Sequence, residues 1–281
     1  LDARTTDRSL ADNARLSNRW ERIHQGGSFF ATERTEVRSI RRAPILGGLG
    51  PIAWRQVLNA LRNSFKLIFV FMGLAASIAP VSMALGAPVR EPHTLMIIYV
   101  FVAFILPRNL VCDFRGDVSR METYKTLPIA PWRICAGQLV VQVFVAYVIA
   151  LTIIASALVF EDKVTTEVAL VLAAFALPLT FLIYAVENTV HLLFPIKLVA
   201  MGRADFEFLG RSIVEFIAKT IFIFVGMAAS GAMGLLTFKM MAVTGTVAGL
   251  ASWLTLTLIG FLAVVGLQYA FQRFAVAETI D

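Results

Sequence analysis

Charge is what this sequence of 281 residues has little of. Charged residues make up 16% of the chain, whereas a soluble domain has about 25%, and 58% of the residues are hydrophobic. The mean hydropathy is +0.76. This composition excludes an ordinary soluble domain and indicates a membrane protein. The net charge of +6 would suggest nucleic acid in a soluble protein, but here we expect basic cytosolic loops that face anionic lipid, and no nucleic-acid partner.

Patterns for catalysis and metal binding are also missing. The chain has no GxxxxGK[ST] run to cradle ATP phosphates and no HExxH pair, and His24, His93 and His191 lie far apart in the sequence. Its two cysteines, Cys112 and Cys135, flank a stretch that we place in the cytosol, where a disulfide is not expected. We therefore expect no catalytic residue, no metal and no cofactor in this chain, which we do not expect to be an enzyme.

The hydrophobic residues gather in six runs, and a membrane-spanning helix takes about 20 such residues. The sequence thus predicts an all-α membrane protein with six transmembrane helices. We place them at residues 67–86, 94–111, 138–160, 168–186, 213–236 and 247–270. The second is the shortest. Pro80 and Pro178 fall inside the first and fourth, where kinks are expected. Gly226, Ser230 and Gly234 form a small-residue series that favours close helix packing in the fifth.

Positive charge is distributed unevenly over the loops between these runs. If the N-terminus is cytosolic, then all but three of the 25 lysines and arginines fall on the cytosolic side. The three exceptions are Arg90, Lys163 and Lys239. Because cytosolic loops are enriched in lysine and arginine, this distribution predicts that both termini lie in the cytosol.

Two segments precede the first run. Residues 1–44 are polar and arginine-rich, and we expect a cytosolic linker or a partly disordered segment. The chain begins with Leu1, so we expect a piece of a longer protein. Residues 45–66 predict an amphipathic helix that lies flat at the membrane surface, although a buried helix of a soluble protein has the same periodicity. Its apolar face would hold Trp54, Val57, Leu58, Leu61 and Phe65, and its polar face Arg55, Asn59, Arg62 and Lys66.

A charged stretch, DFRGDVSRMETYKTLP, separates the second run from the third. The spacing of Phe114, Val118, Met121 and Tyr124 predicts a short helix with an apolar stripe. Asp113 and Asp117 lie near its start, where the helix dipole favours acids, Glu122 and Lys125 are spaced to pair, and Pro128 and Pro131 would end it. The stretch could be a docking surface for a soluble partner or a plain connector on the membrane surface.

Ionisable residues near the middle of a span usually mark an ion path, and the six runs have none there. A polar cluster is expected only at the cytosolic ends, from Glu187 and Asn188 after the fourth run and from Glu215 and Lys219 at the start of the fifth. The last two are spaced as an ion pair on one helix, and we expect an interfacial anchor with a snorkelling lysine. Gln138 and Gln142 could bond to a neighbouring helix or line a polar cavity.

Three motifs resemble one family. LPRNLVCDFRGDVSRMETYKTLPIAPWRICAGQL resembles the cytosolic loop of ABC exporter membrane subunits of the type-2 class, through Asp113, Arg115, Asp117 and the Leu127-Pro128-Ile129 run. GPIAWRQVLNALR resembles the helix before the first span in that family. YAVENTVHLLFPIK resembles the segment after its fourth span. The resemblance covers roughly residues 50–281.

The resemblance implies a six-span permease domain over residues 67–281, in the bacterial cytoplasmic membrane. The charged stretch would be the coupling helix that docks on a separate cytosolic ATP-binding subunit, which would hold ATP and magnesium. Its contacts would be Asp113, Arg115, Asp117, Arg120 and Glu122. A second permease half would complete the transporter, either a preceding half of the same chain or a second copy.

Two other functions stay open at this point. The same loop could recruit a cytosolic protein to a membrane scaffold that transports nothing. The chain could also be an ion-coupled secondary transporter, although the lack of charge in the middle of the runs argues against an ion path.

Overall fold

The computed structural model describes residues 48–84, 92–109, 114, 117, 120–161, 164–193, 206–241 and 245–274. All regular structure in these ranges is helical. The predicted linker at residues 1–44, the predicted contacts Asp113 and Arg115, and Val118 of the predicted apolar stripe lie outside the described residues.

The described helices follow one another along the chain and are separated by short connections. They are α2 (Leu49–Asn59), the π-helix η2 (Ala60–Ser64), α3 (Phe65–Ala84), α4 (Pro92–Asn109), α5 (Met121–Thr126), α6 (Pro131–Phe160), α7 (Thr166–Leu193), α8 (Phe206–Met241) and α9 (Gly245–Arg273).

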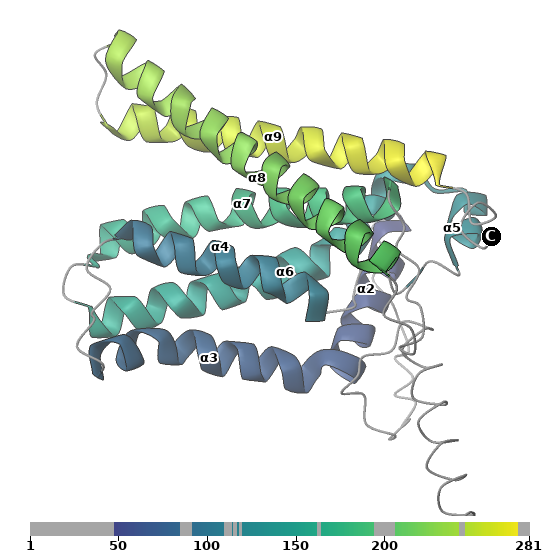
Figure 1. Ribbon diagram of the computed structural model, residues 1–281, viewed down its shortest axis with the longest axis horizontal. Helices are drawn as coiled ribbons and strands as arrows, with labels where there is room; N and C mark the ends of the chain where they lie inside the picture. Colours follow the sequence, from purple (N-terminus) through teal and green to yellow (C-terminus); the bar gives the residue numbers. More distant parts are fainter. Residues whose placement is uncertain are drawn as a thin grey trace, which may run out of the picture.

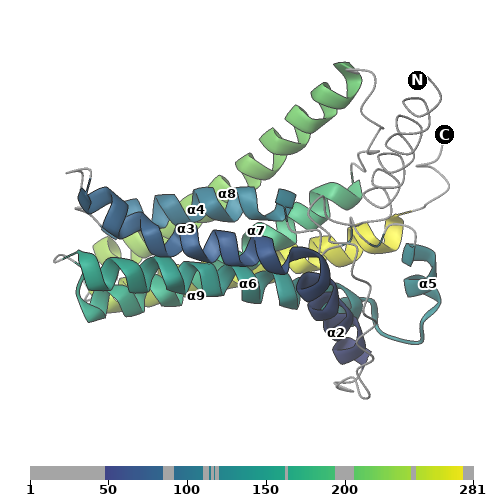
Figure 2. The ribbon, with the colours of Figure 1, turned by 90° about the horizontal axis from the view of Figure 1, so that it is seen from below.

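The long helices form one bundle (Figure 1). α3 packs on α6, α6 packs on α7, and α7 packs on α9, while α4 lies against α6 and α7. α8 and α9 form a hairpin, and the first turns of α8 lean away from the bundle in Figure 2. The small-residue series of α8 packs as predicted, because Ser230 Oγ lies 2.9 Å from Ser252 Oγ of α9 and a Cβ on Gly234 would lie 3.1 Å from the same side chain.

Five helices are long and apolar enough to cross a membrane: α3, α6, α7, most of α8 (Ile213–Met240), and α9. The apolar part of α4, Thr94–Pro107, is shorter, in line with the prediction that the second run is the shortest. Large apolar side chains on the outer faces are exposed, among them Phe69, Phe101 and Phe222. Such faces suit lipid rather than water, and the chain has the form of a multi-pass integral membrane protein.

The helices extend further than their apolar runs. α6 begins at Pro131 rather than 138, α7 continues to Leu193 rather than 186, and α8 begins at Phe206 rather than 213. Hydropathy marks only the apolar part of a helix, whereas backbone hydrogen bonding continues through polar residues. The predicted proline positions inside helices are confirmed for Pro80 and Pro178.

One end of the bundle collects α2, α5, the end of α7, the start of α8 and the end of α9 (Figures 1 and 2). There Lys125 of α5 donates to the carbonyl oxygen of Phe274, and the rings of Phe114 and Phe271 lie 5.6 Å apart. At the opposite end, the charged side chains that the structure describes are Glu161, Glu167 and Lys239. Two of these three side chains are acidic.

Candidate functional site

α2 is fixed to the bundle by a row of residues four apart. Ile52, Gln56, Ala60 and Ser64 are buried, and this row faces α6. Gly137 of α6 allows the close approach, because a Cβ there would lie 3.0 Å from Ile52 Cβ. The prediction placed this helix flat at the membrane surface, and the structure adds that one of its faces packs on α6. The hydropathy pattern missed the row because two of its four members are polar and one is small.

The predicted apolar face is only partly covered. Val57 packs against Ala60 and Val141, and Trp54 is half-buried, while Leu61 and Phe65 are exposed. Arg62 is exposed on η2. The axis turns between α2 and α3 (Figure 2), and the π-helix that joins them is a common cause of such turns.

Asp117 is the centre of a buried polar cluster, the α2–α5 cluster, which consists of Arg55, Gln56, Asp117, Tyr124 and Gln138. The Asp117 side chain is 3% exposed. Its Oδ2 accepts hydrogen bonds from Gln56 Nε2 at 3.0 Å, Gln138 Nε2 at 2.9 Å and the Tyr124 hydroxyl at 2.8 Å. Its Oδ1 pairs with the Arg55 guanidinium. One carboxylate thus joins α2, α5 and α6.

The charge of Asp117 explains this concentration of donors. A buried carboxylate is costly unless it is paired and hydrogen-bonded, and here a cation and three neutral donors meet it. Arg55 also donates to the Tyr124 hydroxyl, and its guanidinium lies 5.7 Å from the centre of that ring. Burial, and then the negative charge of Asp117, raise the pKa of Tyr124, so the phenol stays protonated as a donor.

The short helix α5 turns its apolar stripe inward. Phe114, Met121 and Tyr124 are buried against the bundle, so the apolar part of the stripe that the structure describes serves internal packing rather than a partner. α5 is also shorter than expected. It ends at Thr126 before Pro128, as predicted, but Pro131 opens α6 instead of ending α5.

The predicted docking residues therefore separate into two groups. Arg120 and Glu122 are exposed on the outer side of α5, together with Thr123 and Thr126. Asp117 is buried, and its oxygens are bonded within the chain, so its position gives it an internal role.

A second buried cluster joins α7 to α8. Lys219 Nζ lies 2.8 Å and 3.1 Å from the two carboxylate oxygens of Glu187, and 3.9 Å from Glu215 Oε1. Lys219 is 1% exposed, Glu187 3% and Glu215 9%. The expected snorkelling lysine is thus wrong, because the side chain points into the bundle and its main partner is on another helix.

Asn188, which was predicted in the same cluster, lies in a different set of contacts. Its Nδ2 donates to Gln142 Oε1 at 3.2 Å and to the Tyr184 carbonyl at 2.9 Å, and its Oδ1 accepts from the Phe114 backbone N–H at 3.4 Å. Gln138 and Gln142 both bond to neighbouring helices, one to α2 and the other to α7.

Sequence patterns had not assigned a role to Gln56 or to the Tyr124 hydroxyl. The signal that could have found Gln56 is the four-residue spacing of small and polar residues along α2, opposite the more obvious apolar face. Tyr124 had been assigned to the apolar stripe, and its hydroxyl carries the polar contact.

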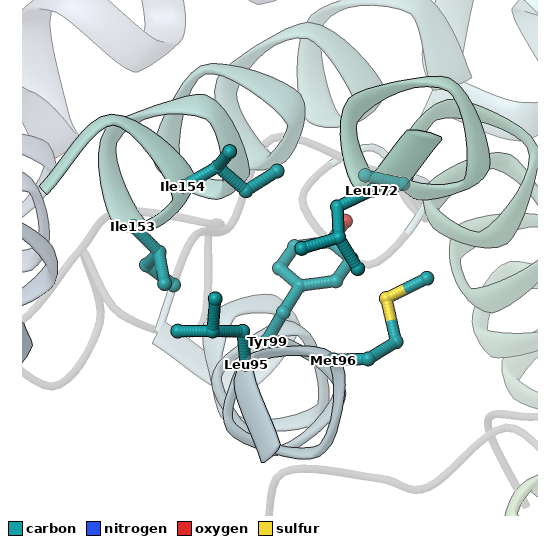
Figure 3. A pocket seen from close by; sticks show the side chains of 7 residues that line it. Leu95, Met96, Tyr99, Ile153, Ile154 and Leu172 are labelled. Carbon is teal, nitrogen blue, oxygen red and sulfur yellow. The ribbon is translucent and has the colours of Figure 1, made fainter. Parts of the chain in front are cut away.

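A small apolar hollow lies between α4, α6 and α7 (Figure 3). It is lined by Leu95, Met96, Tyr99, Ile153, Ile154, Leu172 and Ala176. None of these residues carries a charge, and the Tyr99 hydroxyl is already bonded to Thr180. The hollow therefore offers no charged group to a ligand.

Within the described ranges, no group of three histidine, cysteine, aspartate or glutamate side chains could hold a metal ion. Comparison of the chain with protein-family models, with curated proteins and with solved structures finds no match.

Proposed function

We propose that this chain is the membrane-spanning permease subunit of an ABC exporter in the bacterial cytoplasmic membrane. In this proposal α5 is the coupling helix and docks on a cytosolic ATP-binding subunit. The observation that carries it is the two-sidedness of α5, whose outer face is exposed while its inner face is bonded to Arg55 of α2, to Asp117 and to the end of α9. ATP would be hydrolysed in the partner, since this sequence has no phosphate-binding loop of its own, and the energy would reach this chain through α5.

The outer face of α5 suits a soluble partner. This face carries a positive charge, a negative charge and a hydroxyl group, from Arg120, Glu122 and Thr123. Such polar groups are typical of the rim of a protein interface. α5 also lies beyond the end of the bundle, beside the last turn of α9 (Figures 1 and 2), where a cytosolic subunit could reach it.

In this proposal α4 also crosses the membrane, as the second of six spans along the chain. Its 18 residues rise about 27 Å at 1.5 Å per residue, close to the hydrocarbon thickness of about 30 Å. α4 also packs on α6 and α7, alongside helices that are long enough to cross. With six spans, both termini lie on the basic side of the membrane, which the positive-inside rule assigns to the cytosol. A second copy or a related half would complete the pathway.

A cross-link tests the docking role of α5. Thr123→Cys is made in a background where Cys112 and Cys135 are alanine, and is co-expressed with the ATP-binding subunits of the source organism. Thr165→Cys is the matched control, because Thr165 is exposed at the opposite end of the bundle. We expect a cross-link from position 123 that responds to ATP, and none from position 165. Equal cross-linking from both positions, or none from either folded variant, would contradict the proposal.

The ATPase rate of the partner gives a second test. Charge reversal at exposed positions of α5, Arg120→Glu or Glu122→Lys, should abolish stimulation of that rate by this chain. Glu167→Lys changes an exposed charge at the other end of the bundle and should leave stimulation unchanged. Binding of a cytosolic protein without any effect on ATP hydrolysis would instead favour a scaffold.

One observation favours a different function. The cluster of Glu187, Glu215 and Lys219 places two carboxylates and one ammonium group in a buried position, and buried ionisable groups in membrane helices often carry ions or protons. An ion-coupled carrier would move its cargo in proteoliposomes under an imposed proton or sodium gradient without any ATP-binding subunit. In that case Glu187→Gln would abolish transport, while the α5 charge reversals would not.

A further inference from the structure

We infer that the Arg55–Asp117 pair is the joint that makes α2 follow α5, so that Asp117 is a positioning residue for coupling and not a docking residue. The inference rests on the proposed function, because it names the route by which a movement of α5 would reach the first span. It starts from the contacts that hold α5.

α5 cannot hold its position by itself. It has six residues, whereas an isolated helix of fewer than about 12–15 residues is marginal in water. The connection from α5 to α6 runs through Leu127–Ala130, which is not helical and includes the exposed Pro128. A displacement of α5 is therefore passed on through its side-chain contacts more directly than through the backbone.

These contacts converge on one oxygen atom. Asp117 Oδ2 accepts from α5 through Tyr124, from α2 through Gln56 and from α6 through Gln138, all within 3.0 Å. The ion pair adds a second link to α2, through Arg55. Removing the charge of Asp117 would leave the Arg55 guanidinium without this partner and would weaken every hydrogen bond to that carboxylate. Two further hydrogen bonds, from Arg55 to the Tyr124 hydroxyl and from Gln56 to Gln138, join members of the cluster directly, and Asp117 is the one group that contacts all the others.

The far side of the joint leads into the membrane. α2 continues through η2 into α3 without a break in the helix, and α3 is the first of the helices that can cross. A π-helical turn is wider than an α-helical turn and often marks a functional position. A displacement of α2 can therefore reach α3 by a change in η2, without unfolding of either helix.

The other contact of α5 leads to α9. Lys125 donates to the Phe274 carbonyl at the end of α9, and this is a single hydrogen bond at the half-buried edge of α5. The α2–α5 cluster is buried and joins three elements, so we expect it to carry the larger share of the coupling.

The variant that tests the joint is Asp117→Asn, which keeps the size of the side chain and removes its charge. Glu167→Gln is the matched control, because it also turns a carboxylate into an amide, but at an exposed position at the other end of the bundle. Arg55→Gln breaks the pair from its partly exposed side and serves as the second variant if Asp117→Asn does not fold.

The first measurement needs no partner. Spin labels at Thr123→Cys on α5 and Arg62→Cys on η2, both exposed positions, report the distance between the two elements in lipid nanodiscs. We expect one narrow distance distribution in the parent protein and in Glu167→Gln, and a broad one in Asp117→Asn and Arg55→Gln. A narrow distribution in all four proteins would overturn the inference, whatever the protein does.

The second measurement uses the ATP-binding subunit that cross-links to position 123. We expect Asp117→Asn to keep that cross-link, while its stimulation of the ATPase rate falls by a factor of about five or more. A factor of about five is the lower limit of typical coupling between two sites. A residue that only stabilised the fold would not separate binding from stimulation in this way. Full stimulation by folded Asp117→Asn would overturn the inference and leave the proposed function standing. The absence of any cross-linked subunit would count against the proposed function alone.

Discussion

Replacing Lys219 should be among the most damaging single changes in this protein. Lys219 is 1% exposed and is the cation between two carboxylates, at 2.8 Å from Glu187 and 3.9 Å from Glu215. Lys219→Met keeps much of the side-chain volume and removes the charge. Two buried acids then lose the ammonium group that lies between them. Removal of one partner from a buried ion pair typically costs about 3–5 kcal/mol, and we expect a loss of this size in the free energy of unfolding.

The geometry also predicts an asymmetry between the two partners. In Glu187→Gln the lysine keeps Glu215 at 3.9 Å, and the amide oxygen still accepts one hydrogen bond. The loss should therefore be smaller, about 1–3 kcal/mol, the range for a lost hydrogen bond to a charged group. The double variant removes both charges of the closest pair, so it should lose less than the sum of the single variants, by about 0.5–3 kcal/mol.

These losses can be measured by titration with SDS in mixed micelles, where helical membrane proteins unfold reversibly enough to give a free energy. The matched control is Lys239→Met, the same substitution at an exposed lysine near the end of the same helix, and we expect a change within about 0.5 kcal/mol. Equal and small losses for Lys219→Met and Lys239→Met would refute the reasoning, because the buried pair would then contribute nothing. Strict additivity in the double variant would show that Glu187 and Lys219 do not interact.

Three further predictions concern packing, topology and pH. Gly137→Ala should cost about 1–3 kcal/mol, because the new Cβ would lie 3.0 Å from a side chain of α2, whereas Gly231→Ala meets nothing within 4 Å and should be neutral or slightly stabilising in thermal unfolding. A membrane-impermeant maleimide should label Thr165→Cys in intact cells and Thr123→Cys only after permeabilisation, and the reverse would contradict the proposed orientation. Burial raises the pKa of Tyr124 in the folded protein, so the contribution of Tyr124 to stability is complete below its unfolded pKa of about 10 and is lost as the pH rises above that pKa. The melting temperature should therefore fall more steeply between about pH 9 and 11 for the parent protein than for Tyr124→Phe.

The positions of the membrane helices could be predicted from the sequence because they depend on composition along the chain. A run of about 20 apolar residues has to form a helix in lipid to satisfy its own backbone, whatever lies beside it. The second run was predicted to be the shortest, and α4 is shorter than the five helices that are long enough to cross a membrane. The helix ends could not be predicted as well, because Arg133 and Glu187 are charged and yet lie within α6 and α7.

The contents of the candidate site were only partly predictable. Spacing along one helix suggested that Glu215 and Lys219 would pair, and they lie 3.9 Å apart. The closer partner, Glu187, is on another helix, and its contact depends on how α7 and α8 are rotated and cross. Lipid tails are as apolar as the side chains that face them, so hydropathy carries little information on which side of a membrane helix meets a neighbour.

What the sequence by itself determined is therefore the membrane class, the approximate helices and the end of the bundle that carries the positive charge, since each follows from residue types counted along the chain. Tertiary structure alone decided that the Ile52–Gln56 row is the buried side of α2, and that Asp117 is an internal link instead of a surface contact. The physical reason is that a buried carboxylate needs donors from several directions at once. Only the meeting of α2, α5 and α6 in space brings those donors together.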